Sequence, residues 1–91
     1  MDMADYRARM DALDRQLAEL FNRRMALAAE IAAYKKEKGL PVLDEKRERE
    51  KLLAVTEASP AELRDYTPRL FALLMELSRS YQERLMGGEA G

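Results

Sequence analysis

Residues 2–38 decide the fold of this chain, and they read DMADYRARMDALDRQLAELFNRRMALAAEIAAYKKEK. The stretch contains neither Gly nor Pro, so no residue in it breaks a helix. Two sets of positions recur at intervals of seven, and nine of these ten residues are apolar. The two sets are Met3, Met10, Leu17, Arg24 and Ile31, and Tyr6, Leu13, Leu20, Leu27 and Tyr34. This heptad spacing predicts one continuous helix with an apolar seam that only Arg24 interrupts.

The length of this helix predicts how the chain assembles. A helix of about 36 residues is about 54 Å long at a rise of 1.5 Å per residue. A compact domain of 91 residues has a diameter of only about 30 Å, so the helix must protrude and its seam needs cover. A second copy related by a two-fold axis covers it most simply. We therefore predict an all-α fold, a three-helix protomer with a very long first helix, in an intertwined antiparallel homodimer.

A second, shorter helix is predicted after a break. Gly39 is a plausible helix stop, and Pro41 prevents the helix from resuming at once. Asp44 is a suitable N-cap for a helix over about residues 45–56.

The last part of the chain predicts a helical turn and a third helix. Ser59-Pro60-Ala61-Glu62 has the pattern of a capping box with Pro at the first helical position. Apolar residues keep helical spacing over about residues 68–86, where we expect the main third helix. The domain is expected to cover residues 1–86, followed by a frayed tail at residues 87–91.

Composition excludes several classes of chemistry. The chain carries 16 basic and 17 acidic residues, a net charge of -1, and neither Cys nor His. Without Cys and His we exclude disulfide scaffolds, zinc fingers, thiol or imidazole nucleophiles and redox-thiol chemistry. The balanced charge gives no reason to expect nucleic acid or a membrane surface as a partner. The polar N-terminus has no apolar signal core and no apolar run approaches the ~20 residues of a membrane span, so we expect a cytoplasmic protein.

Two cations on the long helix are candidates for chemistry. Arg24 occupies a seam position, where an unpaired buried charge is costly. Arg24 could form a buried ion pair that sets the helix register, extend its charged end to solvent, or belong to a ligand site. Lys35 lies within about 20° of Arg24 around the helix and about 16 Å along it. Alone, Lys35 reads as a solvated lysine that suits the helix C-terminus.

A third cation can join them only through dimerisation. Arg7 lies about 25 Å from Arg24 along the same helix, so the two cannot share one pocket within a chain. In an antiparallel dimer centred near residues 18–20, the partner's Arg7 falls beside residues 29–33, between Arg24 and Lys35. Three cations that meet in a helical core favour the binding of an anion with at least two negative charges.

Polar residues also interrupt the apolar faces of the two shorter helices. Ser78 and Gln82 lie four residues apart in an apolar stripe of the third helix. They read as core polar residues with satisfied hydrogen bonds, as residues at the edge of the stripe, or as ligands. Asp44, Arg47 and Glu48 open the second helix. They read as an N-cap with a surface pair to neighbouring Arg or Lys, or as part of the same site.

These spaced polar residues, and not only the helical pattern, resemble those of the all-helical chorismate mutase family, most closely its small bacterial type. The resemblance covers about residues 5–85. It rests on Leu13-Asp14, Leu20, Arg24, Lys35, Pro41-Val42-Leu43-Asp44, Arg47-Glu48, Arg69-Leu70-Phe71, Ser78 and Gln82. It implies an isomerase that converts chorismate to prephenate in Phe and Tyr biosynthesis, in an intertwined dimer with two equivalent sites.

The resemblance also implies a role for each candidate residue. Arg24 and the partner's Arg7 would clamp the two carboxylates of chorismate, with help from Ser78 at one of them. Lys35 and Gln82 would bind the ether oxygen of the breaking C–O bond.

The remaining roles concern the ring of the substrate. Glu48, with the backbone at Asp44, would hold the ring hydroxyl. Arg47 would line the pocket and orient Asp44 or the substrate. The rearrangement takes place within one molecule, so it requires no nucleophile, general base, metal or cofactor.

Two other functions stay open on the sequence alone. An isochorismate pyruvate lyase would have the same fold and a similar cationic pocket, although Ser78, Glu48 and Gln82 together favour the mutase. A non-catalytic helical dimerisation module would turn over no chorismate. Some short members of the family also work weakly until another enzyme of the shikimate pathway docks on them, so such a partner is possible.

Overall fold

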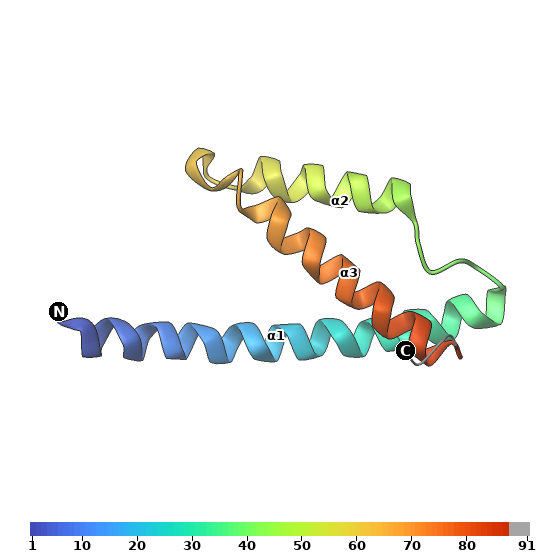
Figure 1. Cartoon of the computed structure of the whole chain (residues 1–91), viewed down its shortest axis with the longest axis horizontal. Helices are drawn as coiled ribbons and strands as arrows, with labels where there is room; N and C mark the ends of the chain where they lie inside the picture. The colour runs from blue at the N-terminus through green and yellow to red at the C-terminus, as the bar shows by residue number, and fades with distance from the viewer. Residues whose placement is uncertain (88–91) are drawn as a thin grey trace.

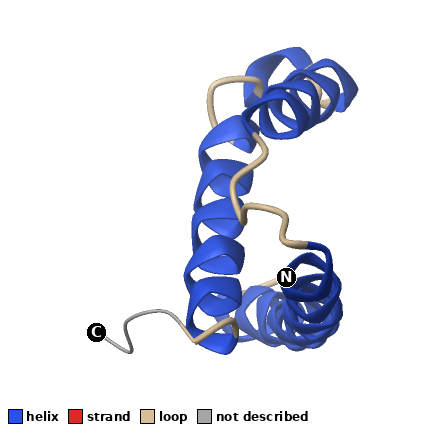
Figure 2. Cartoon of the chain, turned by 90° about the vertical axis from the view of Figure 1, so that its right-hand side faces the viewer, coloured by secondary structure: helices blue, strands red, loops and turns tan. Residues whose placement is uncertain are grey.

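The computed structural model describes residues 1–87, and the regular structure in this part of the chain is helical. The elements in chain order are α1 (Met3–Lys38), α2 (Glu45–Ala58), the 3₁₀ turn η1 (Ala61–Leu63) and α3 (Thr67–Leu85). In Figure 1, α1 is a single long rod and α3 crosses obliquely from the end of α2 to the C-terminal half of α1. Figure 2 shows the same arrangement end-on, with α3 joining the other two helices. The predicted three-helix all-α protomer with a very long first helix is confirmed.

The two ends of α1 are closed by the residues next to them. At the start, the Asp2 carboxylate accepts from the Asp5 N–H at 3.0 Å, and the Asp5 carboxylate accepts from the Asp2 N–H at 3.2 Å. At the end, Gly39 adopts a left-handed conformation with φ 68° and ψ 29°. The Leu40 N–H then donates back to the Lys35 carbonyl at 2.8 Å. The predicted stop at Gly39 is therefore confirmed, and it turns the chain towards α2.

The start of α2 agrees with the sequence, because the Asp44 carboxylate accepts from the Arg47 N–H at 3.0 Å. The capping box predicted at residues 59–62 is wrong. The Ser59 hydroxyl donates to the Val55 carbonyl at 2.7 Å, so it closes the end of α2 and does not cap the next turn. As a result α2 runs to Ala58, two residues beyond the predicted end.

The third helix begins one residue earlier than predicted, at Thr67. Its hydroxyl donates back to the Leu63 carbonyl at 3.3 Å, which links α3 to the preceding turn. Of the frayed tail predicted at residues 87–91, residues 88–91 lie outside the described part of the chain.

The apolar seam of α1 is exposed in a single protomer. Leu13, Leu17 and Leu20 are 54%, 60% and 56% exposed. The protein extends 54 Å along its longest axis, and its radius of gyration is 16.3 Å. The long helix therefore outreaches its own protomer, as its length predicts. None of the three α-helices within residues 1–87 combines the length and apolar character needed to cross a lipid bilayer.

Burial in one protomer concentrates where α3 crosses α1. Ala28 and Ala32 are 3% and 1% exposed, and Met75 of α3 is 8% exposed. The two alanines lie one turn apart on α1, and their small side chains allow α3 to approach closely. This crossing brings the middle of α3 next to the C-terminal half of α1.

Gly39→Ala should lower the free energy of unfolding by about 1 kcal/mol, because an L-residue resists the left-handed conformation. An added Cβ would meet no atom within 4 Å, so the loss would come from the backbone and not from a clash. Denaturant unfolding at one fixed protein concentration measures it. Gly39→Asn is the control and should lose less, since Asn tolerates positive φ. Equal losses for Ala and Asn would contradict this explanation.

Candidate active site

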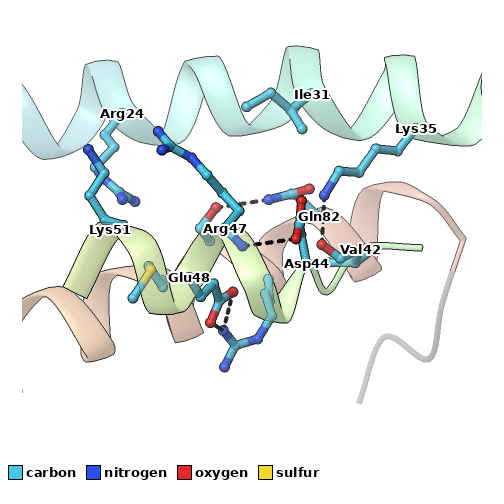
Figure 3. A pocket seen from close by; sticks show the side chains of 12 residues that line it. Arg24, Ile31, Lys35, Val42, Asp44, Arg47, Glu48, Lys51 and Gln82 are labelled. Atoms are coloured by element: carbon cyan, nitrogen blue, oxygen red, sulfur yellow. Dashed lines mark hydrogen bonds and ion pairs between the residues drawn. The ribbon is translucent and has the colours of Figure 1, made fainter. Parts of the chain in front are cut away.

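A cavity of about 170 Å³ lies where the C-terminal half of α1, the start of α2 and the C-terminal half of α3 meet (Figure 3). Seven of the eight predicted site residues line it. They are Arg24, Lys35, Asp44, Arg47, Glu48, Ser78 and Gln82. The other lining residues are Ile31, Val42, Lys51, Met75 and Arg79. The structure therefore brings together residues that are up to 58 positions apart in the sequence, Arg24 and Gln82.

Arg7 is the predicted site residue that this cavity does not contain. It lies in the protruding N-terminal half of α1, on the same rigid helix as Arg24. The two residues are 17 positions apart, which corresponds to about 25 Å of helix. Within one chain Arg7 and Arg24 are therefore separate, as the length of the helix predicts.

The two cations from α1 are held by backbone carbonyls. Lys35 Nζ donates to the Val42 carbonyl at 2.6 Å, which ties the end of α1 to the segment leading into α2. Arg24 Nη1 donates to the Leu74 carbonyl of α3 at 3.5 Å. Both side chains are half-buried. Each cation is thus oriented by a backbone carbonyl, and neither has an acidic partner in the described part of the chain.

The buried amide of Gln82 has one unused polar atom. Gln82 is 5% exposed, and its Nε2 donates to the Ser78 hydroxyl at 2.9 Å. Among residues 1–87, its buried Oε1 has no hydrogen-bond partner, which is a costly state for an amide oxygen. Because a hydroxyl can also donate, turning the amide by 180° keeps the bond to Ser78 and presents Nε2 in place of Oε1. Gln82 can therefore donate a hydrogen bond to an acceptor in the cavity.

Arg79 is a site residue that the sequence analysis missed. It forms an ion pair with Glu48, in which Nη1 contacts both carboxylate oxygens. One reading of Glu48 was a surface pair with a neighbouring Arg or Lys, whereas its partner lies 31 positions away on α3. The sequence did contain one signal for Arg79 as a site residue, namely its position between the predicted site residues Ser78 and Gln82.

Lys51 is the second residue that was missed. In the sequence, the run of charges over residues 45–51 has the pattern of a solvated helix face. Lys51 follows Arg47 by four residues, so the two side chains lie on one side of α2. Figure 3 shows both on the side of α2 that faces Arg24. All three residues also line a second hollow that shares Ile31 and Ser78 with the first.

The charges around the cavity do not balance. Within residues 1–87 the structure holds a single ion pair, Glu48–Arg79. In that part of the chain, the other four cations at the cavity therefore have no acidic partner; they are Arg24, Lys35, Arg47 and Lys51. The Asp44 carboxylate is engaged as the N-cap of α2. Such a cluster favours an anion with more than one negative charge.

The sequence model of one protein family, chorismate mutase type II, matches residues 6–83 of the chain. The chain belongs to this family. The matched region spans all three α-helices and includes all eight predicted site residues. No curated protein and no solved structure matched the chain. The resemblance seen in the sequence is thus confirmed at the level of the family.

For a chorismate mutase, the cavity contains the appropriate types of group. Chorismate carries two carboxylates, and unpaired Arg and Lys side chains suit them. The Gln82 amide is neutral at every pH and adds a donor on α3. The family activity, an isomerisation of chorismate, therefore agrees with the excess of cations over free carboxylates at the cavity.

Lys51→Met should raise KM for chorismate about five- to tenfold and change kcat by less than about twofold. A cation that attracts the dianion equally before and during the reaction contributes to binding alone. Lys46→Met is the matched control, because Lys46 is exposed on the same helix and does not line the cavity. Steady-state kinetics at one ionic strength measures both variants. An unchanged KM for Lys51→Met would show that Lys51 takes no part in substrate binding.

Proposed function

We propose that this chain converts chorismate to prephenate in aromatic amino-acid biosynthesis, at two equivalent sites of an intertwined antiparallel homodimer in the cytoplasm. The observation that carries the proposal is the gathering of unpaired Arg24, Lys35 and Arg47 around the buried amide of Gln82. As for some short members of the family, an enzyme of the shikimate pathway that docks on this dimer would raise the rate further.

The chemistry of the reaction explains why these groups suffice. One C–O bond of chorismate breaks while one C–C bond forms in the same molecule, and no group leaves. Catalysis then consists of folding a flexible dianion into its reactive shape and stabilising charge as it separates. Positioned cations and hydrogen-bond donors perform both tasks, so no nucleophile or general base is needed.

The dimer supplies the cation that one chain lacks. The seam residues Leu13, Leu17 and Leu20 are more than half exposed in the protomer, and a second α1 would cover them. Pairing α1 with an antiparallel copy centred near residues 18–20 would bring the partner's Arg7 beside residues 29–33. Ile31 lies in the middle of that range and lines the cavity. The partner's Arg7 would therefore enter the cavity between Arg24 and Lys35.

The carboxylates of chorismate are assigned to two arginines. Arg24 and the partner's Arg7 would each bind one carboxylate through the two-pronged guanidinium, which fixes both position and orientation. Ser78 would contribute its hydroxyl to one of them. Holding both ends of the molecule restricts it to the compact shape in which the new bond can form.

The ether oxygen is assigned to Lys35 and Gln82. Negative charge grows on this oxygen as the C–O bond breaks, so a cation there stabilises the transition state more than the bound substrate. Lys35 is oriented by the Val42 carbonyl, and Gln82 is oriented by Ser78. On the ring side, Glu48 and the backbone at Asp44 would hold the hydroxyl, and Arg47 would line the pocket beside them.

Purified wild-type protein should produce prephenate when it is incubated with chorismate. Lys35→Ala should lower kcat by at least about a hundredfold, on the scale of a lost oxyanion donor. Lys36→Ala is the control, because Lys36 is exposed in the same turn of α1 and does not line the cavity. Isochorismate should be tested in parallel. Pyruvate released from isochorismate without prephenate from chorismate would identify a lyase, and no turnover of either would identify a non-catalytic module.

A mixture of Arg7→Ala and Arg24→Ala chains should recover activity that neither variant has alone. Each mixed dimer would contain one intact site, with Arg24 from one chain and Arg7 from the other. Random reassociation makes about half of the dimers mixed, so about a quarter of the wild-type activity should return. The control mixes Arg7→Ala chains with chains that carry both substitutions, which leaves no intact site. No recovery in the first mixture would refute the shared site.

A further inference from the structure

The ion pair between Glu48 and Arg79 joins two walls of the cavity. Glu48 belongs to the first turn of α2, and Arg79 lies on α3 between Ser78 and Gln82. Their side chains are 24% and 29% exposed, so the pair is partly shielded from water. It is also the single ion pair within residues 1–87. The chain therefore uses this strong interaction inside the candidate active site and not on its outer surface.

Without Arg79, the Glu48 carboxylate would be free to pair with cations that the substrate needs. Lys51 lies three residues further along α2, at a spacing that allows an ion pair on a helix. Arg47 precedes Glu48 and also lines the cavity. A Glu48 carboxylate released from Arg79 would be drawn to these cations. Pairing with them would reduce the positive charge available to the carboxylates of a dianion.

The geometry of the pair leaves Glu48 able to accept a further hydrogen bond. A carboxylate has about four lone-pair positions on its two oxygens. Nη1 of Arg79 approaches both oxygens from one edge. The other lone pairs stay available to a hydroxyl in the cavity, while the position of the carboxylate is fixed relative to α3. Since α3 also carries Ser78 and Gln82, the pair aligns α2 with the helix that provides these donors.

We propose, on the basis of the proposed function, that Arg79 is a positioning residue for the mutase reaction. It holds the Glu48 carboxylate in place to accept the ring hydroxyl of chorismate, and it keeps that carboxylate away from Arg47 and Lys51. Arg79 does not contact the substrate and acts through Glu48 alone. Its contribution to catalysis should therefore disappear when Glu48 loses its charge.

A double-mutant cycle on kcat/KM for chorismate tests this coupling. Arg79→Met should lower kcat/KM about ten- to a hundredfold, as expected for a lost charged hydrogen bond. In a Glu48→Gln background, the same substitution should lower kcat/KM by less than about twofold. Arg79→Lys keeps the charge and should recover part of the loss. Arg84→Met is the matched control, because Arg84 is exposed on α3 and does not line the cavity.

Three results would overturn the inference. One is an equal fold-loss on Arg79→Met in the wild-type and Glu48→Gln backgrounds. The second is a lower melting temperature for Arg79→Met with an unchanged kcat/KM, which would indicate a purely structural pair. The third compares Arg79→Lys, which keeps the positive charge, with Arg79→Gln, which removes it, and it can be used even if the Met variant does not fold. An equally low kcat/KM for both variants would show that the charge of Arg79 does not matter. Failure of wild-type protein to convert chorismate would instead refute the proposed function, so the two failures are distinguishable.

Discussion

An apolar seam on a helix that is too long for its own protomer is the constraint on which this structure depends. The helix α1 contains 36 residues, and the protein is 54 Å long in that direction. The other two helices are shorter, and α3 packs against only the C-terminal half of α1 (Figure 1). The N-terminal half therefore presents its seam to solvent in one chain. All the helices are formed in one chain, but the apolar seam of α1 is not buried there.

The place where the protomer does bury residues is also the candidate active site. Ala28 and Ala32 on α1 allow α3 to come close, and Met75 and Gln82 on α3 are buried there. Gln82 is thus a polar side chain among the few buried residues of the described chain. A packed helix crossing fixes its position, which would suit the contact with the transition state that is proposed for Gln82. The same helix crossing thus provides the buried packing of the protomer and one wall of the candidate active site.

Features that depend on neighbouring residues were predictable from the sequence, and features that depend on distant ones were not. The long helix, the stop at Gly39 and the N-cap at Asp44 follow from local spacing and backbone preference. Ser59 was assigned to the wrong helix, because a hydroxyl between two helices can bond in either direction. Arg79 was missed because its partner lies on another helix. For Arg24, spacing alone left an ion pair, a side chain that snorkels to solvent and a ligand site open, and the family resemblance favoured the ligand site.

The exposed seam has a consequence for how such an enzyme responds to dilution and to mutation. In the proposed dimer, the surface that completes the core is the surface that delivers the partner's Arg7. Assembly and activity are then one equilibrium, so an isolated chain lacks both its cover and its full set of substrate ligands. A substitution at Leu17, on the exposed seam far from the cavity, would act as an active-site substitution. In the proposed dimer, natural variation along this seam would therefore be constrained by catalysis as well as by stability.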